Sequence, residues 1–231
     1  MIEKKNIVVI IPAFNEENSV GNVLKDIPND LVSEVVVVNN NSNDNTRLNA
    51  QKGGATVLDE KRQGYGYACL KGIAYVKEKT HKPDIVVFID ADYSDYPQEM
   101  TDLVKPIIEL DYDMVIGSRA IGNRERGSMT PQQIFGNKLA TNLMKLLYGI
   151  QYTDLGPFRA IKFGKLLELD MKDTTYGWTV EMQLKAAKQE MKITEVPVNY
   201  KKRIGFSKVS GTVKGTIMAG YKIITTIFKY I

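Results

Sequence analysis

The chain has 231 residues, 43% of them hydrophobic and 25% charged, and a formal net charge of +4, which is the composition of an ordinary soluble globular protein with a substantial core. Its single cysteine, Cys69, excludes an intramolecular disulfide framework and a multi-cysteine zinc site. The sequence shows no nucleic-acid recognition module, no signal-peptide pattern and no run of the roughly 18 apolar residues that a membrane span needs, so we expect a cytoplasmic protein that binds no nucleic acid.

The first half of the sequence alternates apolar runs with amphipathic segments, which predicts βαβ units and a largely parallel sheet. Strands are expected at residues 7–11, 35–38, 55–58, 85–89 and 114–117. Helices are expected between them at about 17–27, 67–79 and 98–110. Asn15 is the candidate N-cap of the first helix, because its side chain can accept a hydrogen bond from a free backbone amide of the first turn.

The pattern changes after Ser118. A loop containing Gly and Arg is expected at 119–131, then a helix at 132–148 and an irregular stretch up to residue 177. The remaining elements are expected as a helix at 179–189, a strand at 193–198, a basic loop at 201–210 and a final helix from residue 212. No internal repeat or linker separates these elements, so we expect one compact domain.

Two carboxylates follow the strand expected at 85–89. Asp90 and Asp92 are spaced i and i+2, so they project to the same side if the chain stays extended there. Carboxylate oxygens suit hard divalent cations, and Mg²⁺ usually completes its shell with water and substrate phosphates. Because open α/β sheets bind ligands at the carboxyl edge of their strands, the pattern indicates a metal-bridged diphosphate. An acidic loop without a metal is the alternative.

Several motifs in a fixed order make the chain similar to family 2 glycosyltransferases of the GT-A fold, and most similar to the dolichyl- or polyprenyl-phosphate mannose or glucose synthase branch. The motifs are Ile10–Glu17, the strand 35–38 with Asn39–Thr46, Asp90–Asp92, Gly117–Arg119, Asp154–Arg159, Tyr176–Glu181 and Arg203–Lys208. The resemblance covers essentially the whole chain. It implies an α/β, Rossmann-like fold with a mostly parallel central sheet flanked by helices and a C-terminal amphipathic helix. Residues 1–231 would form a single domain, with a nucleotide-sugar-binding half at 1–118 and an acceptor-side half at 119–231.

The resemblance implies that Pro12, Phe14 and Glu16 line the nucleotide pocket, with the aromatic ring against the base or ribose. Phe14 could instead belong to the core, and Glu16 could serve a capping role at the strand end. Where many relatives carry an Asp pair that reads the base, this chain has Asn39 and Asn40. An amide can still pair with a base edge, so the resemblance leaves uracil and guanine both open. A turn-forming polar tract is the alternative for this segment.

Two glycines, Gly64 and Gly66, precede the helix expected at 67–79. They could let the backbone approach the donor diphosphate, although a flexible turn explains them equally well.

The resemblance assigns Asp90-Ala91-Asp92 to the donor and its metal, which would be Mg²⁺ or Mn²⁺. Asp92 would hold the ion, with Asp90 supporting it or the nucleotide, and the ion would stabilise the departing diphosphate as a Lewis acid. Arg119 and Arg159 are candidates to clamp phosphates, because a guanidinium matches phosphate geometry with two hydrogen bonds. Ion pairs on the surface are the alternative for both arginines.

On the acceptor side, Asp154 and Glu181 are the candidate general bases, with a loop-stabilising role as the alternative for Asp154. A lipid-phosphate acceptor would need positioning more than deprotonation, because a phosphate monoester is already largely ionised at pH 7. Arg203, Ser207 and Lys208 would supply that positioning. The resemblance implies a single displacement with inversion. The Gln-X-X-Arg-Trp motif of processive members is absent, which favours transfer of one sugar.

The final helix combines apolar residues at steps of three and four with interrupting lysines, a pattern typical of interfacial helices. Peripheral contact with the inner face of the membrane is therefore one expectation, and packing on the sheet or in a homo-oligomer is the other. Three further alternatives are a soluble acceptor, a catalytically silent nucleotide-sugar-binding protein and a sugar-1-phosphate nucleotidyltransferase. The last would carry a Gly-rich loop where this chain has Pro-Ala-Phe-Asn-Glu-Glu.

Overall fold

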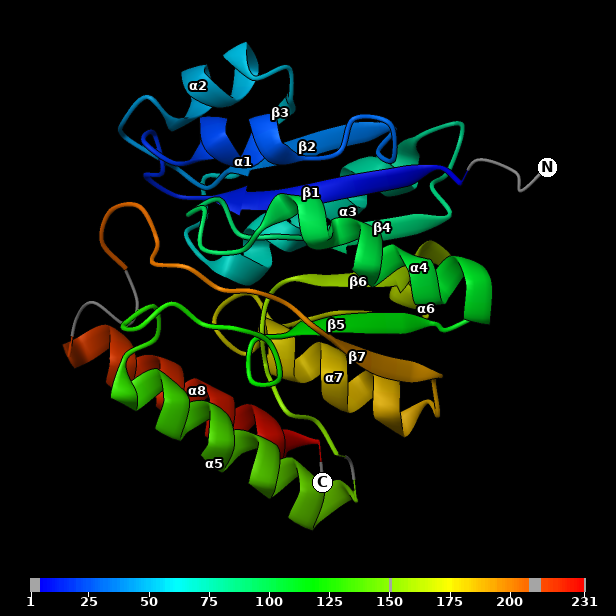
Figure 1. The fold of residues 1–231 in the computed structure, drawn as a ribbon, viewed down its shortest axis with the longest axis vertical. Helices are drawn as coiled ribbons and strands as arrows, with labels where there is room; N and C mark the ends of the chain where they lie inside the picture. Colours follow the sequence, from blue (N-terminus) through cyan, green and yellow to red (C-terminus); the bar gives the residue numbers. More distant parts are fainter. Residues whose placement is uncertain (1–4, 150, 208–212, 231) are drawn as a thin grey trace.

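A computed structural model describes residues 5–149, 151–207 and 213–230, with the side chains of 213, 214 and 216 excepted. Its centre is a seven-stranded sheet in the order β3-β2-β1-β4-β6-β5-β7 (Figure 1). The strands are β1 (Ile7–Ala13), β2 (Glu34–Asn39), β3 (Thr56–Asp59), β4 (Ile85–Phe88), β5 (Met114–Ser118), β6 (Arg159–Lys162) and β7 (Ile193–Pro197). All are parallel except β6, which pairs antiparallel with both β4 and β5.

Helices cover both faces of the sheet. They are α1 (Val20–Asp26), α2 (Thr46–Lys52), α3 (Tyr65–Glu78), α4 (Met100–Leu110), α5 (Pro131–Tyr148), α6 (Phe163–Glu168), α7 (Trp178–Lys188) and α8 (Val213–Lys229), with a 3₁₀ turn, η1, at Pro97–Glu99. In β1, Val8 and Ile10 pack in one cluster with α3, α5 and α7, whereas Val9 and Ile11 pack with α1 and α4. Because both faces of the central strands are buried, their sequences are nearly continuous apolar runs.

The α/β fold with a mostly parallel sheet is confirmed, and three local expectations are corrected. The stretch before residue 177 contains β6 and α6, and a helix that was not expected, α2, begins at Thr46, the last residue of the polar tract that follows β2. The first helix starts later than expected and its N-cap is Ser19. Asn15 instead adopts a left-handed backbone conformation, with a φ of 53°, in the turn after β1.

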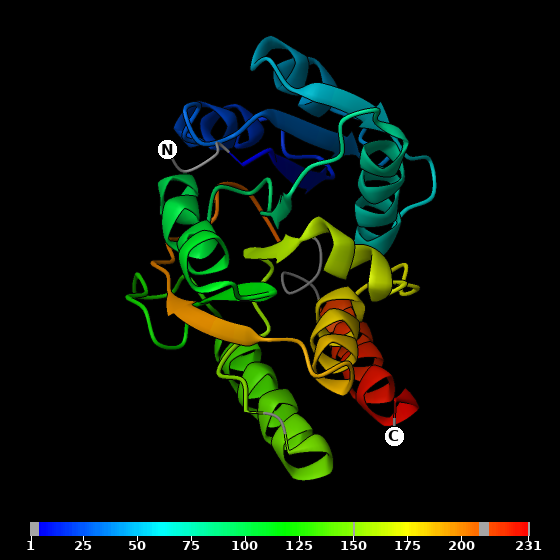
Figure 2. The same ribbon diagram turned by 90° about the vertical axis from the view of Figure 1, so that its right-hand side faces the viewer.

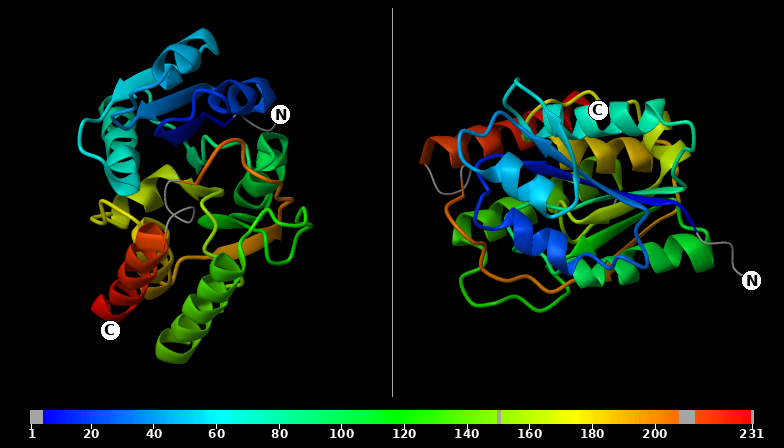
Figure 3. Two further views of the ribbon diagram at one scale, coloured as in Figure 1. Left: turned by 90° about the vertical axis from the view of Figure 1, so that its left-hand side faces the viewer. Right: turned by 90° about the horizontal axis from the view of Figure 1, so that it is seen from above.

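Two consequences of the topology position the site. The carboxyl ends of β1, β2, β4 and β5 lie at one edge of the sheet, and β6 begins at that edge because it runs the other way. The segment 198–207 then returns across this edge (Figure 3).

Helices α5 and α8 lie side by side at the end of the molecule opposite α2 (Figures 1 and 2). Within the described residues, no helix has the length and apolar character required to span a membrane.

Candidate active site

An acidic corner forms where the chain leaves β4. Asp92 is buried, and its Oδ1 accepts a hydrogen bond from the backbone amide of Ser94 at 2.9 Å. Asp90 places its Oδ1 in the interior without a hydrogen-bond partner among the described residues. Burial and the neighbouring Asp92 carboxylate raise the pKa of Asp90 to about 7. Two close, poorly solvated carboxylates favour a cation beside them.

Arg203 supplies a cation to this corner. Its Nη1 lies 3.1 Å from Asp92 Oδ2, and its Nη2 donates to Glu16 Oε1 at 2.6 Å. The backbone of the same segment is fixed too, because the amide of Ile204 donates to the carbonyl oxygen of Asp92 at 3.0 Å. The returning segment therefore joins the ends of β1 and β4 through charge as well as through the backbone.

The donor set of this corner fits a divalent ion of the Mg²⁺ or Mn²⁺ type. Within the described ranges, no group of three or more His, Cys, Asp or Glu side chains converges as a ready-made metal cage. Asp90 and Asp92 both offer hard oxygen ligands, and the buried Oδ1 of Asp90 has no hydrogen-bond partner among the described residues. Magnesium-type ions are commonly held by one or two carboxylates, with water and substrate phosphates completing the shell.

At the end of β1, Pro12 is buried and pairs with Val38, whereas Phe14 is only half-buried in the turn that follows. The ring of Phe14 is therefore partly accessible at the carboxyl edge. Glu16 is buried, and its backbone amide donates to Thr46 Oγ1 at 2.7 Å. These contacts tie the turn after β1 to the start of α2.

Asn39 and Asn40 hold the loop that follows β3. Asn40 Nδ2 donates to the carbonyl oxygen of Arg62 at 2.7 Å, and its Oδ1 accepts from the amide of Gly64 at 2.8 Å. Asn39 Nδ2 donates to Asp59 Oδ1 at 2.9 Å. Asp59 was missed by sequence reasoning, although it ends the strand next to β2, where a parallel neighbour presents its carboxyl end. The Asn39–Asp59 pair thus brings a carboxylate to the carboxyl edge of β2 and β3.

Gly64 and Gly66 lie against a neighbouring loop. A Cβ at Gly64 would sit 2.3 Å from the carbonyl oxygen of Thr174, and one at Gly66 would sit 2.1 Å from that of Asp173. Gly64 also has a φ of 151°, which few side chains tolerate. Close packing of the 173–174 backbone accounts for both glycines.

Arg119 and Asp154 form a two-pronged ion pair beneath the corner. Nε and Nη2 of Arg119 each donate to a carboxylate oxygen of Asp154 at 2.7 Å, and the guanidinium stacks on the ring of Tyr200. Burial opposes ionisation of Asp154, but Arg119 outweighs it and the pKa of Asp154 is lowered.

Asp95 is another residue that the sequence did not single out, and it is buried nearby. Burial, together with the Asp90 charge, raises the pKa of Asp95 well above its ordinary value.

The other two candidate catalytic residues are also buried. Glu181 accepts from the backbone amides of Lys172 and Asp173 and from the Tyr230 hydroxyl at 2.7 Å, and pairs with Lys185. Arg159 is fully buried on β6 and donates to main-chain carbonyls, including that of Thr179 at 3.1 Å. These contacts support positioning roles for both side chains.

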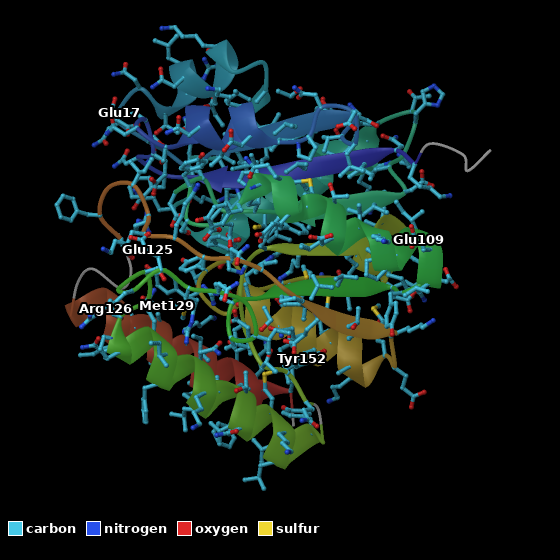
Figure 4. All side chains as sticks on the ribbon, in the orientation of Figure 1. Glu17, Glu109, Glu125, Arg126, Met129 and Tyr152 are labelled. Atoms are coloured by element: carbon cyan, nitrogen blue, oxygen red, sulfur yellow. The ribbon has the colours of Figure 1, made fainter. Side chains whose placement is uncertain are left out.

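Two cavities flank Arg203. One, of about 170 Å³, is lined by Gly127, Ser128, Thr130, Gln133, Tyr200, Lys202, Arg203 and Ser207. The other, of about 250 Å³, lies toward the end of β1 and is lined by Asn15, Glu16, Glu17, Asn18, Asp44, Ile204, Gly205 and Phe206. Figure 4 shows Glu125, Arg126 and Met129 in the loop that leads into α5. Gly127 and Ser128 of the same loop line the first cavity. Lys208 lies outside the described residues.

Comparison with known proteins agrees with this architecture. The family model for glycosyl transferase family 2 matches residues 8–169. An uncharacterized protein of Methanocaldococcus jannaschii is 32% identical over 96% of this chain and 91% of its own length. A dolichyl-phosphate hexose transferase of Haloferax volcanii is 31% identical over 88% and 86%, respectively. Glucosyl-3-phosphoglycerate synthase of Mycobacterium tuberculosis, solved with Mn²⁺, UDP and glucosyl-3-phosphoglycerate, has the same fold, with a TM-score of 0.76, 22% identity and coverage of 98% and 80%.

Proposed function

The chain belongs to glycosyl transferase family 2, and we propose that this enzyme transfers one sugar from a UDP- or GDP-sugar to a polyprenyl phosphate, with inversion at the anomeric carbon. The observation that carries the proposal is the placement of Asp90 and Asp92 at the carboxyl end of β4, beside Arg203, which lines one cavity and binds Glu16 in the lining of the other. One cavity would take the nucleotide and the other the acceptor.

On the donor side, the proposal rests on the pairing of acidic ligands with an arginine. Asp92 and Asp90 would hold Mg²⁺ or Mn²⁺, which when bound would stabilise negative charge on the departing diphosphate. Arg203 is held by Glu16 and Asp92, and a donor phosphate could replace either carboxylate as its partner. The related fold solved with Mn²⁺ and UDP supports a metal-dependent nucleotide-sugar donor.

At the carboxyl ends of β1 and β2, Phe14 and the Asn39–Asp59 pair are the groups that would receive the nucleoside. Phe14 is accessible enough to contact a ring, and the Asn39–Asp59 pair offers an amide oxygen and a carboxylate to a base edge. Pro12 and Glu16 would shape the floor of this pocket. Arg119 would act on the diphosphate only from the base of the site, because Asp154 holds its guanidinium.

On the acceptor side, the proposal rests on charge. The cavity at the start of α5 is lined by Lys202, Arg203 and Ser207 together with Tyr200, and none of the described residues that line it carries a carboxylate. Such a site suits a phosphate. The candidate bases Asp154 and Glu181 are buried in ion pairs, and an ionised phosphate acceptor needs neither of them. Relatives whose names specify dolichyl phosphate support the same acceptor class.

A transfer assay with matched acceptors tests the proposal. The purified enzyme would be incubated with Mn²⁺ and UDP- or GDP-hexoses, together with either a short-chain polyprenyl phosphate or the same polyprenol without phosphate. Mass spectrometry should find a glycosyl phosphate product only with the phosphorylated acceptor. Transfer to a soluble alcohol acceptor instead, or donor binding without any transfer, would overturn the proposal in favour of a different acceptor or a silent binding protein.

A further inference from the structure

Helices α5 and α8 expose a regular apolar stripe each. On α5 the exposed residues Phe135, Leu139 and Leu146 are spaced i, i+4 and i+11, and on α8 Ile217, Tyr221 and Phe228 have the same spacing. At 100° per residue, residues with this spacing fall within about 40° of one another on a helix. Between 52% and 79% of five of these side chains is exposed, with Leu139 at 41%. Exposed apolar residues this well aligned indicate a binding surface.

The same two helices have an unusual charge pattern. Their sequences contain five lysines and no Asp or Glu, although the whole chain has nearly as many acidic residues as basic ones, 27 against 31. Lys138, Lys145 and Lys229 are exposed, whereas Lys222 pairs with Asp173 at 3.0 Å and holds α8 to the body of the protein. The two stripes and these three exposed lysines are called the lysine-edged face below.

We propose that the lysine-edged face docks on the surface of an anionic lipid bilayer. Apolar side chains on one side of a helix, flanked by lysines, suit the boundary between headgroups and acyl chains, and the lysines add attraction to anionic lipids. A second copy of the chain fits this face poorly, because the lysines of one copy would meet lysines rather than acids on the other. Within the described residues no helix can span the membrane, which agrees with docking on its surface.

Docking of this face would bring the acceptor cavity to the membrane. Thr130 and Gln133, which line that cavity, form the capping box at the start of α5. The segment 200–207, which lines the cavity opposite them, is followed along the chain by α8. A bilayer under the two helices would therefore lie next to the cavity that we assign to a lipid phosphate, so the inference deepens the proposed function and rests on it for that assignment.

Co-sedimentation with vesicles tests the docking without any turnover. The full chain would be mixed with phosphatidylcholine vesicles with and without phosphatidylglycerol, none containing an acceptor lipid. We expect binding to the anionic vesicles that weakens as salt is added. The paired variants Phe135→Gln/Leu146→Gln and Ile217→Gln/Phe228→Gln should each bind at least tenfold more weakly, since each removes buried apolar area from the contact. Lys138→Gln and Lys145→Gln should each cost roughly fivefold.

The controls are residues of matched chemistry at other sites. Leu48→Gln on α2 and Leu110→Gln on α4 remove exposed apolar side chains, and Lys52→Gln removes an exposed lysine, all outside α5 and α8. These variants should bind anionic vesicles as the unaltered chain does. Circular dichroism of every variant would establish that it is folded.

Absence of vesicle binding by the unaltered chain, or equal losses in the control variants, would overturn the inference. So would a dimer in light scattering that the α5 and α8 variants dissociate, without vesicle binding, because the face would then receive a second copy. Vesicle binding without sugar transfer would instead contradict the proposed function and leave the docking surface supported. The two claims therefore fail by different measurements.

Discussion

The Arg203 guanidinium lies 3.1 Å from the Asp92 carboxylate, although 110 residues lie between Asp92 and Arg203 along the chain. The second prong of the same guanidinium reaches Glu16 at 2.6 Å. One side chain thus neutralises carboxylates at the ends of two parallel strands. Arg203 therefore lines one cavity and binds Glu16 in the lining of the other, and in the proposed function it would lie between the donor and the acceptor.

Replacement of Arg203 should reduce transfer strongly with little effect on folding. We expect Arg203→Gln to lower kcat/KM by about 100-fold, the scale of losing one preorganised donor to developing charge. Arg203→Lys should restore only part of kcat/KM. The planar guanidinium binds the two carboxylates through separate nitrogens, which a single ammonium group cannot do. Steady-state kinetics would measure both variants. The exposed Lys52→Gln on α2, a residue that lines neither cavity, serves as the control, and equal losses there would count against a specific role for Arg203.

The Arg119–Asp154 pair should stabilise the fold. Asp154→Asn leaves a buried guanidinium without its counter-charge, so we expect the free energy of unfolding to fall by about 3–5 kcal/mol in urea titrations. The double variant Arg119→Met/Asp154→Leu should recover part of that loss, because both charges are removed together. Normal stability of Asp154→Asn combined with lost turnover would instead identify Asp154 as the general base.

The Arg119–Asp154 pair should also make the free energy of unfolding decrease as the pH is lowered into the acid range. The pKa of Asp154 is lower in the folded protein than the ordinary value of about 3.9, so the unfolded chain takes up its proton first. Its stabilisation is present above pH 4 and is lost as the pH falls through the lowered pKa. Unfolding free energies measured from pH 6 down to about pH 3 should therefore decline more steeply in the unaltered chain than in Asp154→Asn. If the unfolding free energies of the two proteins fell with equal slope, the lowered pKa of Asp154 in the folded protein would be contradicted.

Substitution of Gly66 distinguishes two roles for the glycines at the start of α3, which are close packing against the 173–174 backbone and contact with the donor diphosphate. A Cβ there would lie 2.1 Å from the carbonyl oxygen of Asp173, so Gly66→Ala should destabilise the protein by about 1–3 kcal/mol. Gly21→Ala, in α1 with open space around it, should instead stabilise by roughly 0.5–1 kcal/mol. Thermal unfolding of both would check the contrast. Unchanged stability of Gly66→Ala with weaker donor binding would favour a diphosphate contact.

The parallel strands could be predicted because burial on both faces makes each one a continuous apolar run, as in Val35–Val38. Strand β6 escaped prediction because it opens with the buried Arg159 and is only four residues long. The edge position of Asp90 and Asp92 followed from the strand before them. The buried contacts of Asp154 and Glu181 could not be predicted from the sequence. Their partners, Arg119 and Tyr230, come from distant segments that only tertiary packing brings together.

The most direct test of the account is calorimetric titration with UDP and GDP, each with and without Mn²⁺, on the unaltered chain, on Asp92→Asn and on the surface control Asp102→Asn. We expect one diphosphate to bind in the presence of Mn²⁺, and Asp92→Asn to lose at least tenfold in affinity while Asp102→Asn binds normally. Metal-independent binding, or binding by Asp92→Asn as tight as that of the unaltered chain, would contradict a metal-dependent donor site at the end of β4.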